Sequence, residues 1–329
     1  MTSLSGEVLQ AAQALARGEL VGLPTETVYG LAADANQPVA VANIFQTKGR
    51  PADHPLIVHV HAAAQVPVFA SAVPAFAQAL MHAFWPGPLT LILRRRAGVA
   101  DAAAGGHPTV ALRCPSHPMA QAVLQAAQAL GVQGVAAPSA NLFGRVSPTS
   151  AAHVREAFPS LLVLDGGSCD VGIESAIVDC SGEHPVLLRP GMLTPSQLTN
   201  ACGVTVLAAP STSRSKGGGQ GLPTQAPAAP GSLASHYAPR ARLRLMNAAD
   251  MGRGLPNALR VAVWSRSPMP VGVAVLQAVM PSDAASCAQA LFAQLRALDA
   301  QGVQEIWVEL PPEGEAWDGV RDRLQRAAA

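Results

Sequence analysis

Apolar residues along the first 200 positions recur sometimes at helical spacing and sometimes in short continuous runs. Val8, Ala12 and Leu15 follow Ser5 at helical spacing, which predicts a helix that ends near Gly18. Short apolar runs stopped by proline or glycine predict strands. The predicted strands cover residues 20–23, 56–60, 89–93, 109–113, 135–137, 161–164, 175–178 and 186–188, and further helices cover 39–47 and 119–130. Because this spacing is too irregular for a simple βαβ repeat, we expect an α/β domain with a twisted mixed sheet and helices on its faces.

A second, smaller α/β pattern occupies residues 241–329. Strands are predicted at 243–246, 261–264 and 305–309, and helices at 284–298 and 317–326. This order is typical of a small Rossmann-like domain with a largely parallel sheet. Neither a GxGxxG nor a Walker motif occurs anywhere in the chain. The role of this domain therefore stays open among regulation, support of a lid and partner docking.

Glycine, serine and proline dominate the stretch between the two patterns. The tract 211–221 is rich in glycine and serine, and 223–231 contains three prolines. A coil of this length spans about 30 Å, which is close to the diameter of a 200-residue domain, roughly 35 Å. We therefore predict a catalytic domain at 1–205, a linker at 206–240 that docks on the active site, and a C-terminal domain at 241–329.

Composition excludes several classes of protein. Apolar residues make up 49% of the 329 positions, so the chain has enough material for buried cores and is not disordered throughout. The 22 basic and 21 acidic residues nearly cancel, which excludes a surface that coats polyanions over its whole extent. Five cysteines without a CxxC pair exclude a disulfide scaffold and the usual zinc ribbons.

Residues 54–93 contain no acidic residue, lysine or arginine, yet they do not read as a membrane span. Pro67, Pro74, Pro86 and Pro88 interrupt the stretch, which is typical of short core elements. The N-terminus has no basic segment before an apolar run, so we expect no signal peptide and a cytoplasmic location.

Lysine and tyrosine are scarce. Lys48 and Lys216 are the only lysines among the 22 basic residues, and Tyr29 and Tyr237 are the only tyrosines. Because the chain strongly prefers arginine, Lys48 is a candidate for a functional role.

The segment 22–31 carries three hydroxyl side chains and one carboxylate after a predicted strand. Taken alone, it favours a capped helical turn, with Thr25 or Thr27 as the N-cap and Glu26 in the first turn.

Lys48 and Arg50 flank a glycine after a predicted short helix, so both cations can converge on one anion. The alternative is a solvated helix C-terminus, where cations are common. His59 ends a predicted buried strand, and a lone histidine there is more often a satisfied core residue than an acid, a base or a ligand.

Arg113 ends another strand, and alternation places it on one face with Thr109 and Ala111. A carboxylate-binding arginine and a surface arginine both fit this position. Arg189 likewise ends the last strand of the domain.

The loop 136–147 offers Ser139, Asn141 and Ser147, which either cradle a phosphate or form an ordinary polar turn. At the end of the linker, a His236-Tyr237 pair stands among glycine, serine and proline, which indicates that this end docks on the protein.

Together these cations and hydroxyl-rich loops predict a site for an anionic substrate, with a nucleotide and a small carboxylate as candidates. No serine, cysteine or lysine nucleophile stands beside a base, so covalent catalysis is not indicated.

At these residues the chain resembles the YrdC family of threonylcarbamoyl-AMP synthases, in the long form that has a linker and an extra C-terminal domain. The matching segments are PTETVYGL at 24–31, KGRPADHPLIVH at 48–59, TVALRCP at 109–115, APSAN at 137–141, GIES at 172–175, LLRPG at 187–191 and HYAP at 236–239. They cover the first 200 residues in order, and HYAP extends the match to the end of the linker.

The resemblance implies an L-threonylcarbamoyladenylate synthase, a nucleotidyltransferase that condenses L-threonine, bicarbonate and ATP and releases pyrophosphate. A tRNA-modifying threonylcarbamoyl transferase would then use the product, and direct tRNA contact is a further expectation. Mg²⁺ is implied together with ATP, without a cage made wholly of protein ligands.

The resemblance also implies roles for individual residues. Lys48 and Arg50 would be catalytic. Lys48, Arg50, Thr109, Ser139, Asn141, Ser147, Arg189 and Tyr237 would bind ATP, and Thr25, His59, Arg113 and Ser175 would bind threonine.

Two other functions compete with this interpretation. Carbamoyl-adenylate-forming maturation factors share the YrdC part, but they carry zinc-binding CxxC pairs that this chain lacks. A double-stranded-RNA or tRNA-binding module needs a basic face, whereas the first 200 residues hold 10 basic and 12 acidic residues.

Overall fold

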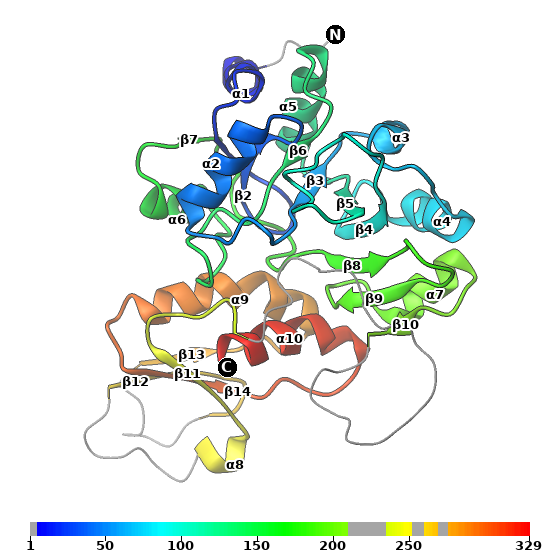
Figure 1. Cartoon of the computed structure of the whole chain (residues 1–329). Helices are drawn as coiled ribbons and strands as arrows, with labels where there is room; N and C mark the ends of the chain where they lie inside the picture. The colour runs from blue at the N-terminus through cyan, green and yellow to red at the C-terminus, as the bar shows by residue number, and fades with distance from the viewer. Residues whose placement is uncertain (1–4, 210–234, 252–259, 269–275) are drawn as a thin grey trace.

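A computed structural model describes residues 5–209, 235–251, 260–268 and 276–329. Within these residues the chain forms two bodies, each built on a sheet of its own (Figure 1). The larger sheet holds the strands up to residue 208, and the smaller sheet holds those from residue 242 onward. The predicted fold class, a mixed α/β domain followed by a smaller parallel α/β domain, is confirmed.

The larger sheet is mixed. Its order in the described residues is β10-β9-β8-β4-β5-β3-β6-β2-β1-β7. The strands are β1 (Val21–Leu23), β2 (Gly30–Asp34), β3 (Ile57–His59), β4 (Leu89–Arg94), β5 (Thr109–Arg113), β6 (Val135–Ala136), β7 (Leu162–Val163), β8 (Ala176–Asp179), β9 (Val186–Arg189) and β10 (Leu207–Ala208). At its centre β3 pairs parallel with β5, and β5 pairs antiparallel with β4. Two predicted site residues, His59 and Arg113, therefore end neighbouring strands as direct register partners.

Helices cover both faces of this sheet. They are α1 (Gly6–Ala16), α2 (Pro38–Lys48), α3 (Val66–Phe69), α4 (Ala75–Phe84), α5 (Pro118–Ala129), α6 (Ala151–Ala157) and α7 (Pro195–Cys202). Successive side chains of a strand point to opposite faces. Along β2, Leu31 and Ala33 thus enter the core beneath α2 and α4, and Ala32 enters the core beneath α1 and α5.

Local sequence explains where several helices begin and end. Proline occupies the first position of α2, α5 and α7, where its missing N–H costs nothing. Thr194 and Gln197 form a capping box at the start of α7. Gly49 ends α2 with a φ of 62°, a conformation that glycine adopts without strain. The helix therefore stops directly after Lys48, and the chain turns back toward the sheet.

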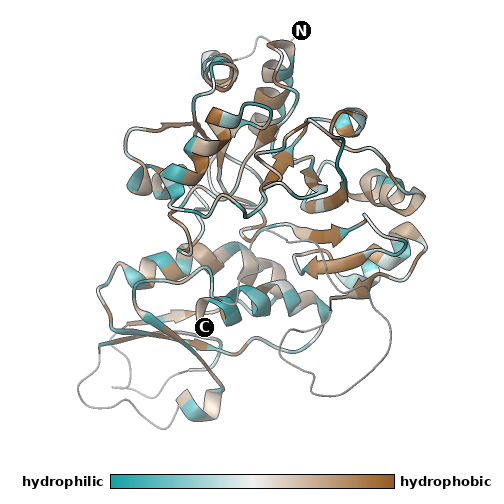
Figure 2. Cartoon of the chain, in the orientation of Figure 1, coloured by the Kyte–Doolittle hydropathy of each residue, from teal (hydrophilic) through white to brown (hydrophobic). Residues whose placement is uncertain are grey.

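The smaller sheet is parallel throughout, with the order β11-β14-β12-β13. Its strands are β11 (Arg242–Met246), β12 (Val261–Ser265), β13 (Leu276–Val279) and β14 (Glu305–Glu309), and its helices are α8 (Ala248–Met251), α9 (Ala284–Asp299) and α10 (Asp318–Ala327). Figure 1 shows α9 and α10 between this sheet and the larger body. In Figure 2, α10 is mostly hydrophilic, whereas the central strands of the larger sheet are mostly hydrophobic.

The two bodies share one apolar core. Val28, Val146 and Ile173 from the larger body belong to the same buried cluster as Phe292 of α9 and Leu324 of α10.

Two glycines let the backbones of the bodies approach closely. A Cβ on Gly172 would lie 2.4 Å from the Cα of Gln289, and a Cβ on Gly319 would lie 2.5 Å from the carbonyl oxygen of Gly191. The packing of α9 and α10 against the larger body therefore depends on positions without a side chain.

The structure corrects some of the predicted elements. The segment after Pro24 does not begin a helix: it forms a turn that leads into β2, a strand the apolar pattern did not reveal. Helices α4, α6 and α7 and strand β13 were also not predicted. Strand β10 pairs with β9 inside the range assigned to the linker, because the chain is still hydrogen-bonded to the sheet there. The glycine- and serine-rich tract 211–221 lies outside the described residues.

Replacing Gly319 tests the close contact between α10 and the larger body. Helix propensity alone makes alanine better than glycine by about 1 kcal/mol. We nevertheless expect Gly319→Ala to lower the free energy of unfolding by about 1–3 kcal/mol, because the new Cβ overlaps the backbone of Gly191. Urea titration of both proteins measures the difference.

Gly6→Ala is the matched control. Gly6 also lies in the first turn of a helix, but nothing lies within 4 Å of the added Cβ. We expect this variant to be as stable as the parent or more so. An equal free energy of unfolding for Gly319→Ala and Gly6→Ala would contradict the close contact inferred between α10 and the larger body.

Candidate active site

Strand ends and loops of the larger body enclose a cavity of about 50 Å³ together with the His236-Tyr237 pair. The lining residues are Thr25, Val28, Gly30, Arg50, Leu56, Ile57, His59, Arg113, Ala137, Pro138, Ser139, Glu174, Ser175, Arg189, His236 and Tyr237. Eight of the twelve predicted site residues are among them. Residues that are far apart in sequence therefore meet at one place.

Lys48 is buried at the end of α2, with 2% of its surface exposed. Its Nζ donates hydrogen bonds of 2.5 Å to the carbonyl oxygens of Ser139 and Asn141. Burial, and secondarily the charge of Arg50, hold the pKa of Lys48 well below its usual value. The alternative of a solvated helix end is wrong, because this lysine fastens the polar loop to α2.

Arg50 follows the glycine turn and lines the cavity. Its Nη2 donates to the carbonyl oxygen of Pro55 at 3.0 Å, and its guanidinium lies 5.8 Å from the ring centre of Phe143. Burial lowers its pKa to about 10, so it remains a cation at neutral pH. Its Nε has no hydrogen-bond partner among the described residues, which leaves one directed donor for a ligand.

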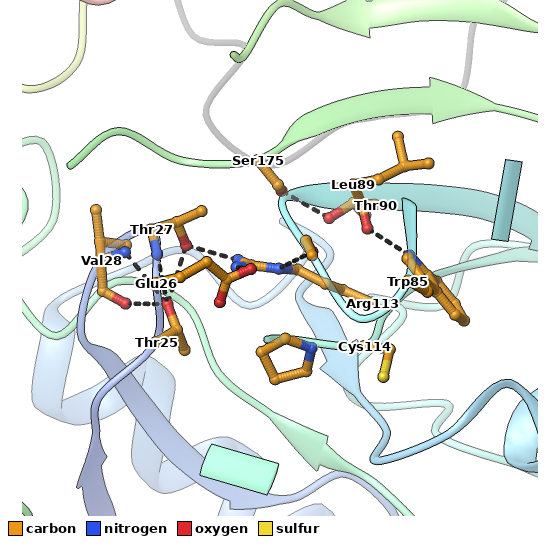
Figure 3. Close-up of polar contacts among 12 residues, drawn as sticks. Thr25, Glu26, Thr27, Val28, Trp85, Leu89, Thr90, Arg113, Cys114 and Ser175 are labelled. Carbon is orange, nitrogen blue, oxygen red and sulfur yellow. Dashed lines mark hydrogen bonds and ion pairs between the residues drawn. The ribbon is translucent and has the colours of Figure 1, made fainter. Parts of the chain in front are cut away.

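Arg113 ends β5 inside the protein rather than on its surface, with 4% exposed. Its Nη2 forms an ion pair of 2.7 Å with Oε1 of Glu26, its Nη1 donates to the Thr27 hydroxyl at 2.7 Å, and its Nε donates to the Gly87 carbonyl (Figure 3). The surface alternative is therefore wrong. The guanidinium already holds a carboxylate, which shows that the position suits one.

The turn at residues 25–28 aims the Glu26 carboxylate at Arg113. The Thr25 hydroxyl donates to the Val28 carbonyl at 2.6 Å and accepts the backbone N–H groups of Thr27 and Val28 at 3.2 Å (Figure 3). The predicted helix cap is wrong, because these bonds close a local turn in place of a helix. Glu26, assigned to a first helical turn, is instead a buried member of the site.

Ser175 and Arg189 form a second polar group at the cavity. Arg189 donates to the Ser175 carbonyl through Nε at 3.1 Å and through Nη2 at 2.9 Å. The Ser175 hydroxyl is 2.7 Å from that of Thr90. Burial lowers the pKa of Arg189, but no base in the site is strong enough to neutralise a guanidinium. A buried positive charge therefore faces the cavity next to a hydroxyl group.

Glu174 lines the cavity beside Ser175 and connects the two bodies. Its Oε1 accepts a hydrogen bond of 2.6 Å from the Ser147 hydroxyl, and its Oε2 lies 2.7 Å from Nε of Arg323 on α10. Burial alone would raise the pKa of Glu174, but Arg323, Arg189 and Ser147 outweigh burial and lower it. Glu174 is therefore ionised at neutral pH.

The end of the linker lies over the cavity. The centre of the Tyr237 ring is 4.1 Å from that of His236 and 5.4 Å from that of Phe292. The backbone of Tyr237 has a φ of 64°. Its hydroxyl is buried without a hydrogen-bond partner in the described part of the chain. Burial raises the pKa of Tyr237 to about 12 and lowers that of His236 to about 4. Both side chains are thus neutral at neutral pH.

Several buried polar atoms around the cavity lack protein partners. They include Nε of Arg50, Nδ1 of His59, Oδ1 of Asn141, Nδ1 of His236 and the hydroxyl of Tyr237, judged over the described residues. Buried polar groups in native proteins are normally hydrogen-bonded. Their concentration here indicates a site for a polar ligand.

Four predicted residues do not line the cavity. Lys48 and Asn141 lie behind its wall, joined to each other through the backbone of the polar loop. Ser147 reaches the cavity only through Glu174. Thr109 is at the other end of β5 and is about 13 Å from Arg113 at the usual rise per residue. It is half-buried there and makes none of the contacts described above.

Sequence reasoning missed Glu174 and Arg323 as site residues. Glu174 stood in the matching segment GIES at 172–175, of which only Ser175 was assigned a role. Arg323 lies in a helix rich in charged residues, where nothing distinguishes it from its neighbours. His236 was singled out only as part of a docking pair, without a position in the site.

No group of three or more acidic, histidine or cysteine side chains in the described ranges could hold a metal ion. In the same ranges, no helix has the length and apolar character needed to cross a bilayer. The carboxylates at the cavity, Glu26 and Glu174, both face arginines.

Family models match the whole chain in two parts. The Sua5, YciO and YrdC model, described as "Telomere recombination", matches residues 13–191. A model described as the C-terminal domain of threonylcarbamoyl-AMP synthase matches residues 193–329. The chain belongs to the Sua5/YciO/YrdC family.

Sua5-type relatives match this chain over almost its full length. Curated proteins named threonylcarbamoyl-AMP synthase are 37% identical in Pyrococcus abyssi and 35% identical in Bacillus subtilis, covering 97% and 98% of this chain and 93% of each relative. One from Schizosaccharomyces pombe is 33% identical and covers 94% of this chain and 85% of the relative. A crystal structure of P. abyssi Sua5 complexed with L-threonine superposes with a TM-score of 0.84 at 34% identity, covering 98% of this chain and 94% of that one.

The buried His59 predicts a pH dependence of stability. Burial, and secondarily Arg113, lower its pKa to about 3 from the usual 6.5. Between these values the unfolded chain binds a proton that native His59 does not, so stability falls on acidification by up to about 1.4 kcal/mol per pH unit. We expect His59→Asn to remove up to this much from the slope of unfolding free energy against pH between about pH 6 and 4.

His184→Asn serves as the control, because His184 is exposed. It should leave the slope of the parent unchanged. An identical slope in the parent and in His59→Asn would mean that His59 titrates normally in the folded protein.

Proposed function

We propose that this protein is an L-threonylcarbamoyladenylate synthase, which condenses L-threonine, bicarbonate and ATP and releases pyrophosphate. The observation that carries the proposal is the Arg113 guanidinium, which is buried at the cavity and already forms an ion pair with the Glu26 carboxylate. Arg50 and Arg189 line the same cavity and supply positive charge that a triphosphate requires, while Lys48 fastens the loop that carries Ser139 from behind the cavity wall. The names of the full-length relatives support this assignment.

Threonine would occupy the part of the cavity near Arg113. Its carboxylate would replace Glu26 on the guanidinium or share the guanidinium with it. Thr25, His59 and Ser175 line the same part and offer hydrogen-bonding groups for the amine and the hydroxyl. His59 is neutral at neutral pH, so the unprotonated nitrogen of its ring can accept a hydrogen bond from the amino group of threonine.

ATP would bind toward Arg50 and Tyr237. Ser139, Asn141, Ser147 and Arg189 complete the proposed nucleotide set, and Thr109 is its most distant member. A cavity of about 50 Å³ is smaller than the roughly 300–1,000 Å³ of ligand pockets. Nucleotide binding therefore requires the site to widen beyond the cavity described above.

The reaction would depend mainly on positioning and on electrostatic stabilisation. The threonine amine forms a carbamate with bicarbonate and releases water. A carbamate oxygen then attacks the α-phosphorus of ATP, and pyrophosphate leaves. Lys48, Arg50 and Arg189 would stabilise the charge that develops on the phosphates.

Mg²⁺ would enter with ATP. Mg²⁺ favours phosphate oxygens and water over a cage of protein ligands, so the phosphates of ATP would hold it. When bound, it would neutralise the departing pyrophosphate.

Two expectations concern events outside the active site. The product is a reactive acyl-adenylate, so a transferase that acts on tRNA would have to consume it downstream. We expect this to occur in the cytoplasm, where ATP, threonine and tRNA coexist. Direct tRNA contact by this chain is a further part of the proposal, and salt-dependent RNA affinity would measure it.

Pyrophosphate release tests the proposed reaction. With ATP and Mg²⁺ present, we expect release to require threonine and bicarbonate together and to stop when either is omitted. Lys48→Ala should reduce the rate by at least about 100-fold, because it removes a charge and unfastens the Ser139–Asn141 loop.

Arg113→Met separates the two halves of the site in the same assay. We expect a large rise in KM for threonine and little change in KM for ATP. Pyrophosphate release that ignores threonine would contradict the proposal and favour a carbamoyl-adenylate-forming enzyme. ATP binding without any release would favour a binding module.

A further inference from the structure

Arg323 is a fully buried cation on the mostly hydrophilic helix α10, with 0% of its surface exposed. Most of its contacts lie outside the C-terminal domain. Its Nε pairs with Oε2 of Glu174 at 2.7 Å, its Nη2 donates to the Glu174 carbonyl at 3.0 Å, and its Nη1 donates to the Pro190 carbonyl at 3.0 Å. Within its own helix it contacts Asp322 at 2.6 Å. A side chain from the C-terminal domain is thus anchored in the wall of the active site.

The contact between Arg323 and Glu174 changes the net charge of the cavity wall. Its carboxylate is ionised and lines the cavity, where the proposed ATP phosphates would also be negative. An uncompensated carboxylate beside a triphosphate would weaken nucleotide binding, since like charges repel strongly in a poorly solvated site. Arg323 neutralises it, while the other carboxylate oxygen holds the Ser147 hydroxyl at 2.6 Å.

Arg323 also contacts the end of the linker. Its guanidinium lies 5.5 Å from the ring centre of Tyr237, which faces Phe292 of α9 on another side. The C-terminal end of the chain binds the same segment: the backbone N–H of His236 donates to the Arg326 carbonyl at 3.0 Å. One arginine therefore touches both the carboxylate in the cavity wall and the tyrosine above the cavity.

The energetics of buried charge argue against a purely stabilising role. A buried ion pair usually adds little to stability compared with apolar packing, because both charges lose their hydration. A buried ion pair does fix the orientation of the groups around it. The Arg323–Glu174 pair orients Ser147 and Tyr237, which both belong to the proposed nucleotide half of the site. The threonine half has its own ion pair, Arg113 with Glu26.

We infer that Arg323 is a positioning residue for the nucleotide half of the active site, so that the C-terminal domain forms part of that site. It does this by neutralising Glu174 and by holding Ser147 and Tyr237 in place. The inference rests on the proposed function for the identity of the nucleotide. It gives the C-terminal domain a role in shaping the nucleotide half of the site, beyond the alternatives of regulation and partner docking.

The test uses the full chain and steady-state pyrophosphate release, with each KM measured separately. We expect Arg323→Met to raise KM for ATP at least tenfold, because Glu174 loses its counter-ion, and to change KM for threonine less than twofold. Arg323→Lys keeps the charge but loses the forked geometry, so it should recover part of the loss. Arg321→Met is the control, because Arg321 is on the same helix and donates a hydrogen bond of 3.4 Å to the Pro312 carbonyl, away from the cavity.

A second substitution distinguishes charge from folding. Glu174→Gln combined with Arg323→Met removes both charges of the pair, and we expect KM for ATP to fall back at least threefold from that of Arg323→Met alone. A purely structural role predicts the opposite, since the double variant loses more contacts. An ATP KM in the double variant equal to or above that of Arg323→Met would overturn the inference. So would equal increases in both KM values.

Titration calorimetry with ATP and Mg²⁺ alone keeps this test independent of turnover. If the parent binds ATP but releases no pyrophosphate under any condition, the proposed function fails, and the calorimetric ATP affinities still test Arg323. If the parent is active and Arg323→Met binds ATP as the parent does, only the inference fails. Should Arg323→Met fail to fold, the double variant and Arg323→Lys carry the comparison with the parent.

Discussion

The requirement that a buried charge have an opposite charge or hydrogen bonds around it shapes this active site. Burying an ion without compensation costs several kcal/mol, yet the site buries two carboxylates and several cations. Each carboxylate has its own arginine: Glu26 pairs with Arg113, and Glu174 pairs with Arg323. Lys48 has no carboxylate and is compensated by two backbone carbonyls. These partners fix the loop, the turn and α10 in their places.

The two ion pairs divide the cavity into two halves. The Arg113 pair lies at the ends of the central strands, where the larger body alone builds the wall. The Arg323 pair lies where both bodies and the linker meet. A carboxylate substrate would compete with Glu26 in the first half, and a polyanion would bind beside a neutralised Glu174 in the second. The inferred role of Arg323 would extend the site into the C-terminal domain, beyond the motifs, which end at residue 239.

The fold was predictable where local sequence decides the structure. Strands β5 and β14 match their predicted ranges, because runs rich in β-branched and apolar residues are bounded by proline or polar residues. Strand β2 was missed, because Gly-Leu-Ala-Ala-Asp has little strand propensity of its own and is held by pairing with β1 and β6. The turn after Pro24 was taken for a helix start, because the same threonine hydroxyls can close a turn or cap a helix.

The site was predictable only in part, because local sequence reveals single cations but not their distant partners. Cations after glycine turns and at strand ends leave a local signal, and Lys48, Arg50 and Arg113 were found in this way. The partners of Arg113 and Arg323 lie 86 and 149 residues away in sequence, at Thr27 and Glu174. No local pattern reports such a pairing. Arg323 in particular shares its helix with four other arginine or aspartate residues, all of them half-buried, and two of these pair with each other.

The most direct test of the account is to identify the product formed from bicarbonate labelled with heavy carbon. The full-length protein would be incubated with ATP, Mg²⁺ and threonine, and the nucleotide products would be separated and weighed by mass spectrometry. The account predicts an adenylate with the mass of threonylcarbamoyl-AMP that is one unit heavier than the product from unlabelled bicarbonate and is absent without threonine. An adenylate without the label, or a labelled adenylate that forms without threonine, would contradict it.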